Sequence, residues 1–157
     1  MAHVFLESFA RPLLVLHALV ALALAGASTH LAIVSWRLWR GAHHLGRLAR
    51  VYAQVIGGCF AVAFLLGLLM YPHYRYAVRG LYLDRYEPWA SNLFDIKENL
   101  AALGIPIAVA LFGVGRKLES GRDQPLLGWL AFLAIANWTL VIAAAVMGLV
   151  VTDVRGV

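Results

Sequence analysis

The sequence predicts an all-α integral membrane protein: a four-helix bundle of four transmembrane helices, with an outer interfacial segment between helices 2 and 3. Three observations predict this fold class. Of the 157 residues, 62% are hydrophobic and only 13% are charged, about half the charged fraction of soluble domains. Four long stretches contain no Asp, Glu, Lys or Arg, and short connections join them. Since four spans occupy most of the chain, we expect a single domain over residues 1–157.

The first span is expected at residues 12–36. The uncharged run there is 25 residues long, more than the roughly 20 apolar residues that cross a hydrocarbon core about 30 Å thick. Its first half, followed by Ala25, Gly26 and Ala27, has the pattern of a signal-peptide core with a cleavage site. However, Glu7 precedes the run and the run continues to Trp36, so we expect an uncleaved helix.

The second and fourth spans are expected at residues 51–72 and 125–151. The uncharged runs at residues 51–74 and 124–152 contain 24 and 29 residues, each long enough to cross. Short connections follow the first and third spans. Spans one and two, and spans three and four, should therefore be antiparallel neighbours.

The third span is expected at residues 93–115, although its uncharged run is too short. That run, residues 99–115, contains 17 residues and would extend only about 25 Å as a helix. The helix can cross only if it includes the preceding residues, among them Asp95, Lys97 and Glu98. We therefore expect one end of this span to carry charge near or inside the lipid.

The charges of the connections predict an orientation. Residues 37–50 contain four arginines and no acid, residues 116–123 contain three cations and two acids, and residues 75–98 contain four of each. By the positive-inside rule, the first and third connections face the cytoplasm and both termini lie outside. We therefore expect a multi-pass protein of the plasma (inner) membrane of a bacterium.

Aromatic residues crowd the middle connection. They are Tyr71, Tyr74, Tyr76, Tyr82, Tyr86 and Trp89. Such residues are typical of headgroup depth, and the helix-like spacing of residues 75–86 predicts a short helix on the outer membrane surface. An ordinary aromatic anchor is one interpretation, and a docking or substrate-binding surface is the other.

Three histidines are candidates for a cofactor site: His17, His30 and His73. His17 and His30 lie in the first span but are 13 residues apart, which places them about 140° apart around a helix rather than on one face. A bis-histidine b-type haem could use His17 and His73 as metal ligands if the chain folds back after Pro72. The alternative is that these histidines form hydrogen bonds between helices.

Glu98 is the fourth candidate residue, because it is the last charge before the short third run. An acid inside a membrane is costly unless it is paired, and it indicates a functional site. A histidine, Glu98 and a tyrosine around an apolar pocket could exchange protons with a quinone headgroup. The predicted cofactor-binding residues are thus His17, His73, Glu98 and His30. The alternatives are an acid at headgroup depth and a salt-bridge cluster that fixes helix packing.

Several classes of function are not supported by any motif. There is no P-loop, Rossmann glycine pattern, HExxH or nucleophile constellation. The single cysteine, Cys59, excludes an intrachain disulfide and a cysteine-rich metal site. No nucleic-acid motif accompanies the net charge of +5, so we assign that charge to contact with anionic lipid headgroups.

The predicted function is a small subunit or cofactor-holding component of a bacterial electron-transfer membrane complex, without catalytic activity of its own. The cofactor would be haem b or a quinone on the outer side. The expected partners are the lipid bilayer and either other membrane subunits or a second copy. One alternative is a structural or assembly protein with no cofactor. Another is a small transporter or channel, which the absence of acids from the other three runs disfavours.

Overall fold

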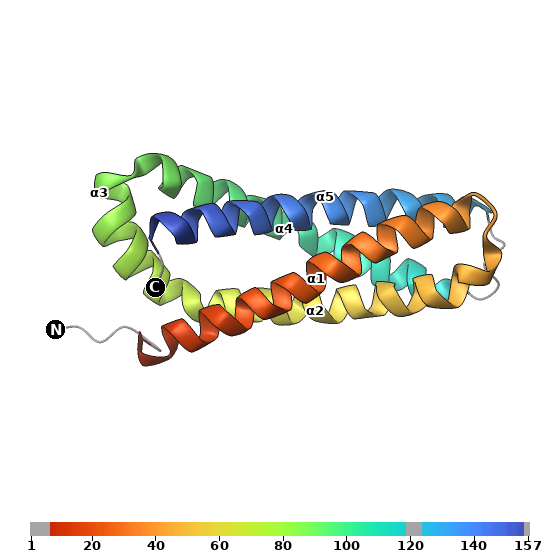
Figure 1. Cartoon of the computed structure of the whole chain (residues 1–157), viewed down its shortest axis with the longest axis horizontal. Coiled ribbons are helices and arrows are strands. Elements are labelled where there is room, and N and C mark those ends of the chain that lie inside the picture. The colour runs from red at the N-terminus through yellow and green to blue at the C-terminus, as the bar shows by residue number, and fades with distance from the viewer. Residues whose placement is uncertain (1–6, 119–123, 156–157) are drawn as a thin grey trace.

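The four predicted helices are present in the computed structural model, which describes residues 7–118 and 124–155. They are α1 (Ala10–Trp39), α2 (Gly46–His73), α4 (Pro88–Lys117) and α5 (Gln124–Val154). All four are long and apolar enough to cross a membrane, which confirms the predicted all-α class. They alternate in direction, so that α1 begins and α5 ends at the same end of the molecule (Figure 1).

The four helices form a ring of neighbours. Helix α1 packs against α2 and α5, and α4 packs against the same two helices. The antiparallel pairs α1–α2 and α4–α5 agree with the short connections. A 3-10 turn, η1 (Glu7–Phe9), precedes α1, and another, η2 (His43–Leu45), joins α1 to α2. Most of the charged connection predicted at residues 116–123 lies outside the described residues.

The segment between α2 and α4 is a continuation of α2. The helix does not end near residue 72; it passes through Pro72 into the π-helix η3 (Tyr74–Leu83) and the short α3 (Asp84–Tyr86). Wide π turns are typical of places where a helix accommodates a bend. Figure 1 shows η3 and α3 curving over one end of the bundle. We call η3 and α3 together the arch, and the two ends of the molecule the arch end and the loop end.

Helix α4 is long enough to cross a membrane because it begins before the short uncharged run at residues 99–115, as the sequence predicts. It begins at Pro88, in the first helical position that proline favours. The helix therefore contains Asp95, Lys97 and Glu98 well after its start. These charges lie within a membrane-length helix and not in a loop.

The apolar core is divided into two clusters. The larger one fills the loop end with residues of all four long helices, among them Leu31, Ile56, Leu111 and Leu130. The smaller one joins the arch to α4 and α5, and consists of Val78, Leu83, Ala90, Phe94 and Val151. Between the two clusters, no residue of α1 from 11 to 23 or of α5 from 142 to 150 is buried. We call this loosely packed part, next to the arch, the open section.

A buried hydrogen bond joins α1 to α5 in the tightly packed half. The Asn137 side chain is 1% exposed and donates from Nδ2 to Oγ of Ser28 at 2.9 Å. By contrast, Thr139 is exposed and donates to the Ile135 carbonyl of its own helix. Of these two side chains, Asn137 therefore bonds to another helix and Thr139 does not.

We expect Asn137→Leu to lower the free energy of unfolding by about 0.5–1.5 kcal/mol, the range measured for hydrogen bonds between membrane helices. Reversible unfolding in mixed micelles would measure this loss. The matched control Thr139→Val should change it little, because its bond stays within α5. A double-mutant cycle with Ser28→Ala should show a positive coupling energy, and strictly additive losses would contradict the role of this bond.

Candidate functional site

His17 lies in the open section with its imidazole oriented by α2. Its Nδ1 is 3.0 Å from the carbonyl oxygen of Ala63. Since a carbonyl only accepts, Nδ1 carries the proton and Nε2 has a free lone pair in the neutral ring. Within residues 7–118 and 124–155, Nε2 makes no hydrogen bond. The ring sits over Gly67, where a Cβ would lie 3.8 Å from Cε1.

Lys97 lies between α4 and α5 and is only partly exposed. Its Cε is 3.5 Å from the place that a Cβ of Gly148 would occupy. Its Nζ is 5.0 Å from the ring centre of Phe94, one turn nearer the arch. No carboxylate among the described residues lies within 4 Å of this ammonium. Lys97 is within electrostatic range of His17, so one helix supplies an imidazole and another an unpaired cation to the same section.

Lys97 was not among the predicted site residues, which on this helix were limited to Glu98. The buried face of α4 includes Phe94, Gly104 and Ala108, and Lys97 follows Phe94 by three residues on that face. The small buried residues later in α4 could have indicated this face from the sequence.

Glu98 faces the arch and not His17. It is partly exposed and makes no hydrogen bond or ion pair within the described ranges. Its charged neighbours, in electrostatic range, are Lys97, Asp95, Arg79 and Arg75. Two of these cations belong to the arch, so Glu98 lies beneath it in a region of positive charge.

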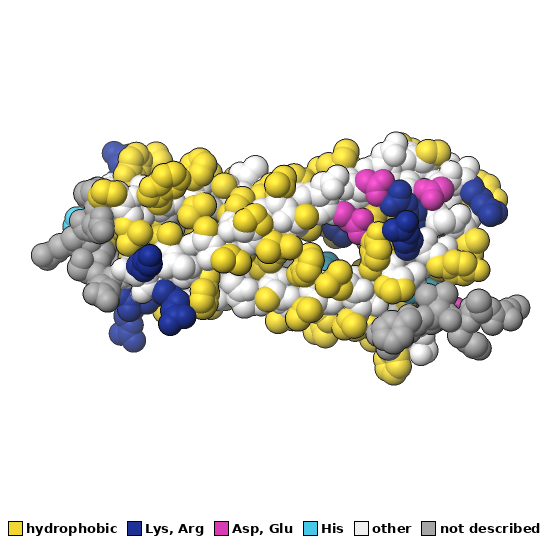
Figure 2. Space-filling view, turned by 180° about the vertical axis from the view of Figure 1, so that it is seen from behind, with side chains coloured by type: hydrophobic (Ala, Val, Ile, Leu, Met, Phe, Trp, Pro, Cys, Tyr) yellow, Lys and Arg dark blue, Asp and Glu magenta, His cyan; other side chains and the backbone are white. Residues whose placement is uncertain are grey.

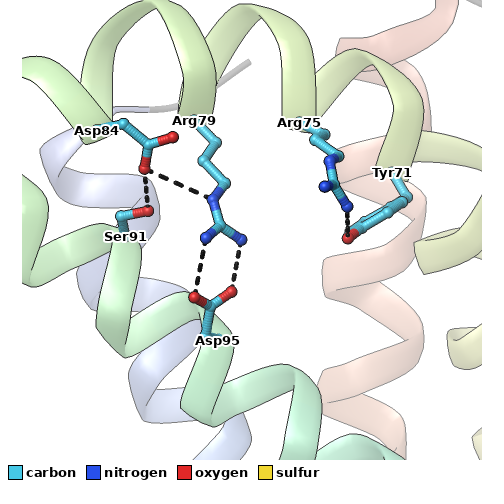
Figure 3. Close-up of polar contacts among 6 residues, drawn as sticks. All are labelled: Tyr71, Arg75, Arg79, Asp84, Ser91 and Asp95. Atoms are coloured by element: carbon cyan, nitrogen blue, oxygen red, sulfur yellow. Dashed lines mark hydrogen bonds and ion pairs between the residues drawn. The ribbon is translucent and has the colours of Figure 1, made fainter.

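Asp95 holds the arch to α4. Its two carboxylate oxygens accept hydrogen bonds from both terminal nitrogens of Arg79, the longer at 2.9 Å (Figure 3). The Nε of Arg79 is 3.6 Å from Asp84, whose carboxylate also accepts a hydrogen bond from Ser91. A bidentate pair of this kind fixes direction as well as distance. The predicted packing role of salt bridges thus applies to Asp95.

Aromatic contacts complete the attachment of the arch. Tyr74 stacks on Phe94 with ring centres 4.1 Å apart. At the far side of the arch, the guanidinium of Arg155 lies 4.9 Å from the ring centre of Tyr82. The arch is therefore fastened to both α4 and α5, and it closes the end of the open section.

The other two predicted histidines lie apart from His17. His30 is exposed on the outside of the bundle, with Nδ1 3.1 Å from the Tyr52 hydroxyl. His73 is partly exposed at the end of α2, and its buried Nδ1 has no hydrogen-bond partner in the described part of the chain. It follows Gly67, on which His17 packs, by six residues, or about 9 Å along the helix. No hydrogen bond or ring contact joins His17 and His73 in the described ranges.

His17 and Lys97 lie at the same depth in a membrane. The first cations of the loop end are Arg37 on α1 and Arg116 on α4. A hydrocarbon core of about 30 Å, or roughly 20 helical residues, ends near residue 17 on α1 and near residue 96 on α4. Both side chains therefore lie near the border between acyl chains and headgroups on the arch side.

The surface agrees with this placement. Figure 2 shows an apolar face that is hollowed between the helices, next to a group of acidic and basic side chains near the arch end. A shallow apolar depression on α5, lined by Pro125, Gly128, Trp129 and Phe132, contains no titratable group. Comparison with protein-family models, curated proteins and solved structures found no match, so the function must be argued from the site itself.

Proposed function

We propose that this protein is a small membrane component of an electron-transfer complex and that it holds a quinone headgroup beside His17. The observation that carries the proposal is an oriented imidazole with a free Nε2 in the open section. A quinone reaches its site from the acyl-chain region and needs polar groups only for its ring oxygens. Histidine exchanges protons near neutral pH, as a group that serves a quinone must.

The arrangement supports a quinone better than a bis-histidine haem. His30 bonds to Tyr52 on the outer surface, and His73 lies about 9 Å farther along α2 than the residue on which His17 packs. The oxygens of a quinone ring, by contrast, require only donors and acceptors at the edge of the open section.

The position of the site also suits a subunit of a larger assembly. Both termini and the arch face outward if the arginines of residues 37–50 are cytoplasmic. The site then opens at the outer side of a bacterial plasma membrane. Electrons would pass between the quinone and a partner subunit, which would pack against the exposed apolar side chains of the long helices. These side chains include Leu19, Leu22, Leu65, Val109 and Leu149.

We expect His17→Phe to reduce the quinone that co-purifies with the protein from bacterial membranes at least fivefold, because phenylalanine removes the ring nitrogen and keeps the ring. Extraction into organic solvent and quantification against protein would measure it. The matched control is His30→Phe, which removes a histidine from the outer surface of the same helix and should leave the quinone content unchanged.

Three outcomes would count against the proposal. The first is a wild-type protein that takes up no quinone even when quinone is added. The second is equal content in wild type and His17→Phe. The third is a Soret band in the wild-type spectrum that disappears in His17→Phe, which would assign haem in place of quinone.

A further inference from the structure

Two helices present polar groups across the open section, and each group faces a glycine. His17 of α1 packs on Gly67 of α2, and Lys97 of α4 packs on Gly148 of α5. Both glycines leave space where a side chain would otherwise stand. The polar groups thus approach the open section from two sides, where no residue of α1 from 11 to 23 or of α5 from 142 to 150 is buried.

We propose that Lys97 is the second binding residue of this site. Its ammonium donates a hydrogen bond to one ring oxygen of the quinone, and Nε2 of His17 accepts a hydrogen bond from the other ring oxygen when that oxygen is the hydroxyl of the reduced ring. This inference rests on the proposed quinone function. It assigns the ligand as a molecule with at least two polar oxygens on one ring, held between α1 and α4.

The first argument is that the Lys97 ammonium lacks an acceptor. A partly buried cation at the edge of a membrane needs hydrogen-bond acceptors to replace water. Asp95 is already engaged by Arg79, and no carboxylate in the described ranges comes within 4 Å of Nζ. The contact with the Phe94 ring supplies electrostatic attraction but no hydrogen bond. A ligand oxygen would satisfy the ammonium.

The second argument is access from the membrane. No residue of α1 between 11 and 23 and none of α5 between 142 and 150 is buried. At this level the two helices do not seal the bundle, so an amphiphile with an apolar tail can enter sideways from the arch-side leaflet. Both polar groups lie at the depth of its headgroup.

The third argument is selectivity. A cation beside the ring oxygens stabilises negative charge that develops on them as the ring is reduced. Lys97 would therefore favour binding of electron-rich ring oxygens over binding of an apolar tail alone. An arginine could make the same contact, whereas methionine would keep the packing against Gly148 and lose the hydrogen bond.

The test is titration of the purified full chain in detergent with a short-tailed benzoquinone, followed by equilibrium dialysis. We expect Lys97→Met to weaken binding at least tenfold and Lys97→Arg to stay within threefold of wild type. Lys117→Met, at the loop end of the same helix, is the control and should bind as wild type does. Because Lys97→Met removes a charge from a membrane helix and changes the length of the side chain little, the variant should remain folded.

A second variant, Gly148→Leu, tests whether the ligand needs the space beside Lys97, and it leaves the charge of Lys97 in place. Leucine at Gly148 would occupy the place next to Cε of Lys97 and should also weaken binding at least tenfold. Leucine at Gly58, which has no neighbouring atom within 4 Å, should not. Wild-type binding by Lys97→Met would overturn this inference.

The failures of the two proposals can be distinguished. If His17→Phe loses the quinone and Lys97→Met keeps it, the quinone function stands and the role of Lys97 is wrong. If the wild type binds no quinone, both are wrong. If phospholipid phosphorus co-purifies with the wild type and is lost in Lys97→Met while quinone binding is unchanged, Lys97 binds a lipid phosphate, which also overturns the inference.

Discussion

Leucine at Gly115 is expected to destabilise the bundle by about 3 kcal/mol, near the upper end of the usual cost of overpacking. Helices α2 and α4 approach each other closely there, and a Cβ at Gly115 would lie 2.6 Å from the Cβ of Ala53. The Ala53 methyl group is attached directly to the backbone and cannot rotate away. The two helices would have to separate, and the core at the loop end would lose contacts with them.

Reversible unfolding in mixed micelles would measure this loss. The control is Gly113→Leu, two residues earlier in α4, where an added Cβ meets no atom within 4 Å. That variant should change the free energy of unfolding by a few tenths of a kcal/mol. Equal losses for the two variants would show that glycine matters for the helix itself and not for its approach to α2.

The positions of the spans could be predicted because the thickness of a membrane imposes them. The charge-free runs at residues 12–36 and 124–152 each fall inside one long helix, and the run at residues 51–74 lies in α2 except for its last residue, Tyr74. The short third run was equally informative, because a deficit of a few residues required the helix to start before Asp95. The extent of the arch was not predicted, since the sequence does not show whether a helix will stop or bend at Pro72.

The side chains of the site were predicted less well than the helices. His17 could be selected because a histidine inside a span stands out. Lys97 could not, because which face of α4 points inward depends on how three other helices pack against it. The sequence also did not show which acid of α4 forms an ion pair. Asp95 and Glu98 have similar sequence surroundings, and only the position of Arg79 on the arch decides which of them is paired.

Firm attachment and loose packing occur next to each other at the arch end. The arch is held to α4 and α5 by one ion pair, aromatic stacking and a small apolar cluster. Directly below it, the open section has few buried residues on α1 and α5. An arch that is held in place above a loosely packed section would let a ligand enter from the side while the end of the bundle stays closed.

Reversing the charge of Arg79 tests whether this residue holds the arch to α4. Arg79→Glu is expected to lower the free energy of unfolding by about 2 kcal/mol. Up to about 1 kcal/mol comes from the lost pair, because the side chains of Arg79 and Asp95 are 24% and 42% exposed. A similar penalty comes from placing a third carboxylate beside Asp84 and Asp95. In this variant, the rate of hydrogen exchange should increase more for the backbone amides of the arch than for those of the loop end.

Arg75→Glu is the matched control, because Arg75 lies one turn away on the arch and donates to the Tyr71 hydroxyl without contacting a carboxylate. It should cost much less. The double variant Arg79→Asp with Asp95→Arg should recover part of the loss, since it restores an opposite pair while Asp84 remains nearby. If the double variant is as unstable as Arg79→Glu, the pair does not hold the arch. If Arg79→Glu also weakens quinone binding and the double variant restores both stability and binding, the arch and the open section form one functional unit.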